Sequence, residues 1–116
     1  MLLYVGLLRE DGTEPSPASG YIRPYTTEFD HVPELNEFRE FLFPAAVNPG
    51  YGSVASVALF DVPEGGEPLK TLSLPGSVEV HEGVTPFLHG GKLMRGIEMS
   101  VRSLTFTKDV CRGEAE

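Results

Sequence analysis

Glycine and proline recur at short intervals throughout the sequence and leave only brief apolar runs between them. The chain has 13 glycines and 10 prolines among its 116 residues, scattered without a fixed period. Gly permits the positive φ angles of tight turns, and Pro removes a backbone donor, so both interrupt long helices and central strands. Many turns between short apolar runs predict many short strands, and hence a single all-β domain.

The apolar runs have the character of strands. Residues 2–8 are apolar and are followed by Asp11-Gly12, a strong turn signal. Residues 53–60 are small or apolar at every position, as in a strand covered on both faces. About seven or eight short strands at roughly ten-residue spacing predict an antiparallel β-sandwich of jelly-roll-like type. We expect them at residues 2–8, 20–26, 40–43, 53–60, 69–74 and 77–81, with a brief pairing over 84–88 and a long final strand from Leu93.

One stretch before the middle of the chain is ambiguous. Leu35 and Phe38 have the spacing of one helical face, and Pro33 fits the first turn of a helix. The run is short, however, and a β-like aromatic and aliphatic run follows it. We therefore favour a loop or one helical turn over residues 27–40, leading into the strand at 40–43.

The end of the chain carries an alternating pattern that changes phase. Apolar residues alternate with polar ones from Ile97 to Val101, whereas Leu104 and Phe106 follow in the opposite phase. This slip predicts a bulge or a break near residues 102–103. We expect one domain over residues 1–107 and a flexible tail over residues 108–116.

The charge of the chain argues against several partners. The formal net charge is −8, and the nine Lys and Arg residues form no cluster. Nucleic acid binding needs a basic stripe, and an acidic membrane surface also attracts basic segments, so neither partner is expected. The apolar start lacks a basic leader and meets Arg9-Glu10-Asp11 at once, so it is a poor signal peptide and too short for a membrane span. Synthesis in a bacterial cytoplasm is the resulting expectation.

No motif for catalysis or metal binding is apparent. The three histidines, His31, His81 and His89, lack the short spacing of zinc or iron ligands. Cys111 is the single cysteine, so no intrachain disulfide can form. No serine stands in a nucleophile elbow, and no glycine pair precedes a helix that would bind phosphate. We expect a protein without a catalytic residue, a metal or a cofactor.

Tyrosine supplies the candidate contact residues. An exposed tyrosine offers a flat apolar face with a polar tip, which suits sugar stacking and protein contacts. Tyr21, Tyr25 and Tyr51 are therefore candidates for a binding surface, including one for a host glycan. The alternative is that they are half-buried tyrosines on strands.

The order of several short phrases is similar to that of a known family. Gly20-Tyr21-Ile22-Arg23 resembles the family's Gly-Tyr-Ala-Arg, and Gly50-Tyr51-Gly52 with Leu59-Phe60-Asp61 resembles its Gly-Trp-Gly and Leu-Phe-Asp. The family comprises small tail-fibre-like proteins encoded among phage and prophage structural genes. The tryptophan of the family is Tyr51 here, and residues 105–116 extend past its end. The matching phrases lie at residues 4–7, 13–16, 20–23, 41–46, 50–61, 80–87 and 91–93, so the resemblance covers about residues 4–101.

This resemblance implies a role in a phage or prophage particle. The chain would leave the cytoplasm as part of a virion, packing against copies of itself or against other phage structural proteins. By analogy with tail fibres, a homotrimer is one arrangement of the homo-oligomer. A carbohydrate- or receptor-binding β-sandwich is the alternative function.

Overall fold

A computed structural model describes residues 1–96, and in this part of the chain the regular structure is almost entirely β. Seven strands and two short 3₁₀ helices are present there, and no helix among these residues is long and apolar enough to cross a membrane. The strands are β1 (Leu3–Arg9), β2 (Tyr25–Thr26), β3 (Phe41–Leu42), β4 (Gly52–Phe60), β5 (Lys70–Val80), β6 (Phe87–His89) and β7 (Lys92–Met94), and the helices are η1 (Pro17–Ser19) and η2 (Leu35–Glu37).

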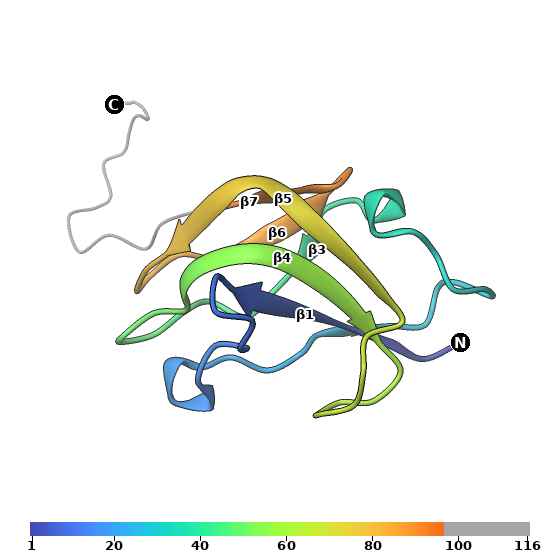
Figure 1. Cartoon of the computed structure of the whole chain (residues 1–116), viewed down its shortest axis with the longest axis horizontal. Coiled ribbons are helices and arrows are strands. Elements are labelled where there is room, and N and C mark those ends of the chain that lie inside the picture. The colour runs from blue at the N-terminus through green and yellow to red at the C-terminus, as the bar shows by residue number, and fades with distance from the viewer. Residues whose placement is uncertain (97–116) are drawn as a thin grey trace.

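The strands form two antiparallel sheets. One sheet has four strands in the order β2-β1-β4-β5, and the other has three in the order β3-β6-β7. The sheets approach each other where β5 runs alongside β7 (Figure 1). Side chains from both sheets share a single apolar core, to which β1 contributes Val5 and Leu7 and β6 contributes Leu88. The predicted all-β antiparallel sandwich is confirmed.

Strand β4 is the interior strand expected from its apolar run. Its last four residues, Val57 to Phe60, are all buried. Val57 and Leu59 point into the core, and by the alternation of a strand Ala58 and Phe60 point to the opposite face. That second face is also covered, because the guanidinium of Arg23 lies over the Phe60 ring.

The strand predicted at residues 20–26 is much shorter in the structure. Only Tyr25 and Thr26 pair with β1. Gly20, with φ 86°, ends the 3₁₀ helix η1 in the left-handed conformation, and Pro24 has no N–H to donate to a ladder. The residues between them follow β1 without forming a ladder, so the predicted extent was wrong.

The strands predicted at 69–74 and 77–81 are one continuous strand, β5. Pro75 and Gly76 lie within it, opposite a register shift between Val54 and Ser56 of β4. Because β5 is the edge strand of its sheet, the missing N–H of Pro75 need not remove a ladder bond. Proline therefore bends this strand without ending it.

The stretch around Leu35 and Phe38, which was ambiguous in the sequence, forms a loop with a single helical turn. The single turn η2 precedes the short strand β3, as predicted. Glu34 and Glu37 form a capping box at its start, with the Glu34 N–H donating to the Glu37 carboxylate at 2.9 Å. The hairpin of β6 and β7 turns at Gly90-Gly91. The long strand predicted from Leu93 is interrupted within the described residues, because β7 ends at Met94 and Gly96 has a φ of 71°. The part of that strand beyond residue 96, its phase slip near 102–103 and the tail at 108–116 lie outside the described residues.

Replacement of the core residue Leu59 by alanine should destabilise the domain strongly. Leu59 is fully buried in the core, so the substitution removes apolar contacts and leaves a cavity. We expect the free energy of unfolding, measured by urea denaturation, to fall by about 2–5 kcal/mol. Leu69→Ala, at an exposed leucine, is the matched control and should change stability by less than about 0.5 kcal/mol. Equal losses in the two variants would contradict the observed packing.

Candidate functional site

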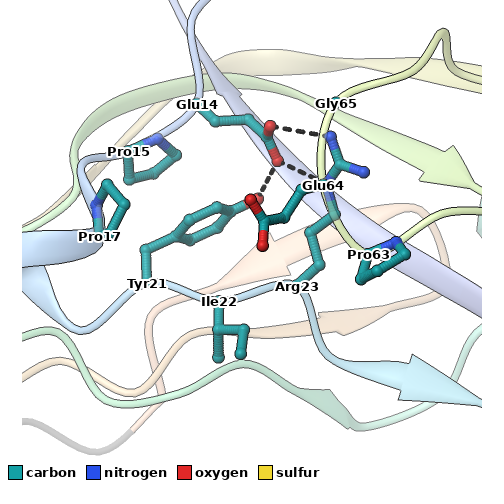
Figure 2. A pocket seen from close by; sticks show the side chains of 9 residues that line it. All are labelled: Glu14, Pro15, Pro17, Tyr21, Ile22, Arg23, Pro63, Glu64 and Gly65. Carbon is teal, nitrogen blue, oxygen red and sulfur yellow. Dashed lines mark hydrogen bonds and ion pairs between the residues drawn. The ribbon is translucent and has the colours of Figure 1, made fainter.

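A hollow lies between two loops beside the four-stranded sheet. It has a volume of about 540 Å³ and is open to solvent on one side. The loop from Glu14 to Arg23 forms one wall, and Pro63 to Gly65, in the connection between β4 and β5, form the other. Figure 2 shows Tyr21 and Arg23 directed toward the carboxylate of Glu14, whereas Ile22 points away from it.

Glu14 is the centre of a compact polar cluster in this hollow. Arg23 binds it with two nitrogens, Nε at 2.8 Å from Oε2 and Nη2 at 2.9 Å from Oε1. The Tyr21 hydroxyl donates a further hydrogen bond of 2.6 Å to Oε2. A bidentate pair between guanidinium and carboxylate is among the strongest polar contacts in proteins, because both bonds are charge-assisted and their geometry matches.

Arg23 is buried, although it carries a charge. Only 3% of its side chain is exposed. Beyond Glu14, its Nη1 donates to the carbonyl of Val62 at 2.8 Å, and its guanidinium carbon lies 3.5 Å from the centre of the Phe60 ring. A buried charge is tolerated when it is paired and hydrogen-bonded, and Arg23 has an ion pair, a carbonyl acceptor and an aromatic face.

The Tyr21 hydroxyl also bonds to the backbone of strand β1. It accepts a hydrogen bond of 3.0 Å from the N–H of Leu7, beyond the point where β2 has ended. On the same edge, Val5 donates to the carbonyl of Pro24 at 3.0 Å, and Arg9 donates to that of Thr13 at 2.8 Å. The Tyr21 hydroxyl therefore accepts the hydrogen bond from Leu7 that a backbone carbonyl would accept if β2 extended this far.

The contacts within the cluster shift the pKa values of Glu14 and Tyr21 away from neutrality, so that neither group changes its charge near neutral pH. Burial by itself raises the pKa of Glu14, but the hydrogen bonds from Arg23 and Tyr21 and the charge of Arg23 outweigh it, and the pKa is lowered. For Tyr21, burial and the bond to Glu14 raise the pKa far above its ordinary value. A general acid or base works best with a pKa near the working pH, and both shifts lead away from neutrality. The cluster is suited to holding the loop against the sheet.

Tyr51 and Tyr21 do not provide the exposed rings predicted from the sequence. Tyr51 is 0% exposed and Tyr21 is 9% exposed, and their rings pack edge to face with centres 5.6 Å apart. The Tyr51 hydroxyl donates to the Pro44 carbonyl at 2.6 Å, and burial raises its pKa to about 12. The prediction of surface contacts was therefore wrong for these two residues, because both rings belong to the core.

Tyr25 alone among the three candidates remains on the surface. It is 65% exposed, and its ring centre lies 6.3 Å from that of the half-buried Tyr4 on β1. The structure therefore separates Tyr25, at the sheet edge, from the two buried tyrosines. It does not gather the three into one binding surface.

Glu14 and Arg23 were not predicted as a pair. Tyr21 and Arg23 are two residues apart in extended backbone, so a shared face could have been inferred from the sequence. Their common partner, Glu14, lies in a separate part of the loop, and nothing in the local pattern distinguishes it from the other acidic residues. Only the folded loop brings the three together.

The histidines form no metal site in the described part of the chain. Among residues 1–96, no group of three or more His, Cys, Asp or Glu side chains is placed to hold a metal ion. His31 lies beside its neighbour Asp30 at 2.9 Å and at 3.7 Å from Glu37, all in exposed positions. His81 binds the carbonyl of Glu82, and His89 lies on β6. Cys111 is outside the described residues.

Removal of the Tyr21 hydroxyl should weaken the edge of β1. Tyr21→Phe leaves the Leu7 N–H without its acceptor, and an unsatisfied buried donor costs about 1–3 kcal/mol. We expect that loss in urea denaturation, together with faster hydrogen exchange at the Leu7 amide. Tyr25→Phe removes a hydroxyl from an exposed ring and should change neither measurement. An unchanged exchange rate at Leu7 in Tyr21→Phe would contradict the role of the phenol.

The Glu14 ion pair should make stability depend on pH. Because the pKa of Glu14 is lower in the folded chain than its ordinary value of 4.5, the stabilisation is complete above that value. It is lost as the pH falls through the lowered pKa of the folded state. We expect the urea midpoint to decline on acidification below about pH 4.5, and to decline less steeply in Glu14→Gln. Parallel pH profiles of the two proteins would show that Glu14 contributes nothing.

Comparison with protein-family models, with curated protein sequences and with solved structures finds no match for this chain. Its candidate function must therefore be argued from its own residues.

Proposed function

We propose that the chain is a structural module of a phage or prophage particle, acting through contacts with copies of itself and with neighbouring tail proteins. Two observations support this role. The ordered phrases between Tyr4 and Val101 resemble those of small tail-fibre-like proteins. The hollow beside Glu14 has proline and isoleucine side chains in its lining, and two of its charged groups, Glu14 and Arg23, are paired with each other.

The rim of the hollow is the observation that carries the proposal. The exposed Pro17 and Pro63 line it together with Ile22, which is 66% exposed, whereas Pro15 in its lining is buried. Proline rings lose little conformational entropy when a partner covers them, and preordered apolar groups favour protein association. Because Glu14 and Arg23 are paired with each other, a partner need not compete for these two charges, and Glu64 is the remaining charged residue of the lining.

The net charge defines what kind of contact can form. Copies that each carry a formal charge of −8 repel one another, so their association must come from apolar contact. Salt screens repulsion between exposed charges. Self-association through the rim should therefore strengthen as the ionic strength increases, the opposite of an interface held by ion pairs.

A glycan-binding function has weaker support. A sugar-binding groove usually needs more than one aromatic face, and of the three candidate tyrosines only Tyr25 is exposed. The half-buried Tyr4 beside it extends the apolar surface only slightly. Protein contact is therefore the function that we favour.

Analytical ultracentrifugation over a range of concentrations tests the proposal. We expect the native chain to form a discrete oligomer, with Ile22→Asp raising the dissociation constant at least tenfold, because a carboxylate in an apolar contact loses its hydration. Val32→Asp introduces the same charge at another exposed apolar residue and is the matched control. It should associate like the native chain, apart from the small effect of one added charge.

Two results would contradict the proposal. A strict monomer at tens of micromolar, at both low and high salt, would exclude self-assembly through the rim. Equal weakening by Ile22→Asp and Val32→Asp would show that charge, and not the rim, controls association.

A further inference from the structure

His31 lies between two carboxylates that come from different parts of the fold. Its Nδ1 is 2.9 Å from Oδ1 of Asp30, its neighbour in the loop between β2 and η2. Its Nε2 is 3.7 Å from Oε1 of Glu37, the last residue of η2. Each ring nitrogen of His31 therefore faces a negative charge, and the ring bridges the loop and the helical turn that follows it.

The carboxylate of Glu37 is shared between His31 and the start of η2. While Oε1 faces His31, Oε2 accepts a hydrogen bond of 2.9 Å from the backbone N–H of Glu34. The carboxylate of Glu34 pairs in turn with Lys70, the first residue of β5, whose Nζ lies 2.6 Å from Oε2. The contacts of His31 thus continue through η2 to the edge strand of the four-stranded sheet.

A second attachment of the loop is apolar and does not titrate. The ring of Phe29 packs on the buried ring of Phe38, with centres 5.0 Å apart, and meets the His31 ring edge to face at 6.0 Å. Phe29 is partly buried against the core of the domain. The loop therefore stays on the core whatever the charge of His31, and only the polar contacts of His31 can respond to pH.

The two charge states of the ring make different contacts. An imidazolium carries an N–H on both nitrogens, so it can donate to Asp30 and attract Glu37 at the same time. A neutral imidazole carries one N–H, which the shorter contact to Asp30 retains. The lone pair on Nε2 then faces the Glu37 carboxylate, and two electron-rich groups repel each other. Loss of the proton therefore breaks the contact between the ring and η2.

The charges around His31 favour its protonated form. The hydrogen bond to Asp30 raises the pKa of His31 most, desolvation lowers it, and the charges of Glu37 and Asp30 raise it further, so the pKa lies above its ordinary value of 6.5. The pKa of Asp30 is lowered, first by its hydrogen bond with His31 and in smaller part by the charge of the Met1 amino group.

We propose that His31 is a pH-dependent latch, which as an imidazolium ties the loop at Asp30 to η2 at Glu37 and as a neutral imidazole releases Glu37. The latch is closed below the ordinary pKa of the ring and opens as the pH rises through the higher pKa of the folded chain. The His31 side chain is 58% exposed, so water and salt screen the contact, and its effect is confined to the loop and the start of η2. It involves no residue of the rim near Ile22 and does not depend on self-association.

A nuclear magnetic resonance titration of the full-length chain between about pH 5 and 9 tests the latch. It follows the imidazole resonances of His31 and the backbone amide resonance of Glu34, which is linked to the ring through Glu37. We expect both to titrate with one midpoint, above pH 6.5. In Glu37→Gln the His31 midpoint should fall and the change at the Glu34 amide should shrink by more than half, because glutamine keeps the hydrogen-bond acceptor but carries no charge.

The matched control is Glu79→Gln, at an exposed carboxylate near the end of β5. It changes the net charge by the same amount as Glu37→Gln, so it measures how far the overall field of the protein acts on His31. The His31 midpoint should stay near the native one in this control. Asp30→Asn removes the other carboxylate beside the ring and should lower the midpoint, as Glu37→Gln does.

A His31 midpoint that falls in Glu37→Gln but not in Glu79→Gln would support the latch. Equal midpoints in the native chain and Glu37→Gln would overturn it, and so would equal shifts in the two glutamine variants, because overall charge would then control His31. The absence of a step at the Glu34 amide of the native chain would also overturn it.

His31→Gln provides a second test that holds even if Glu37→Gln does not fold, since it leaves every acidic residue in place. It should abolish the step at the Glu34 amide. A step that persists without the imidazole would mean that another group controls the start of η2, and the proposal would be wrong.

Discussion

The outer edge of β1 is the constraint on which much of this structure depends. An edge strand presents a line of backbone N–H and C=O groups that need partners, and β2 pairs with only its first two residues. The remaining N–H groups on this edge, at Val5, Leu7 and Arg9, donate to Pro24, Tyr21 and Thr13, respectively. A loop with fixed geometry therefore replaces a strand along most of this edge.

That replacement explains why a charged cluster lies in a small β domain. A phenol can stand in for a carbonyl only if its position is fixed, and the bond from Tyr21 to Glu14 fixes it. Glu14 is in turn held by Arg23, whose remaining bond to Val62 joins the loop to the connection between β4 and β5. The same contacts that close the edge thus bring two loops together, and the hollow lies between them.

Local patterns predicted where most strands lie, but not the extent of several of them or which tyrosines are exposed. The run at 53–60 is apolar on both faces, so its interior position could be inferred without knowing its neighbours. Whether Pro75 ends a strand depends on whether that strand is at an edge, which is a property of the whole sheet. The burial of Tyr21 likewise depends on Leu7, which is 14 residues away. A tyrosine's own sequence neighbours do not encode such a contact.

Exposed apolar residues lie in two separate places, at Ile22 in the loop before β2 and at Leu42 on β3, and this separation matters for assembly. If copies met both at Ile22 and at Leu42, each copy could hold one neighbour through each place. Contacts of that kind extend into filaments unless the rotation between copies closes a ring. A chain that associates only through the rim near Ile22 presents one surface to its neighbours. Its net charge of −8 then opposes unspecific association, so a closed oligomer is the assembly that these surfaces favour.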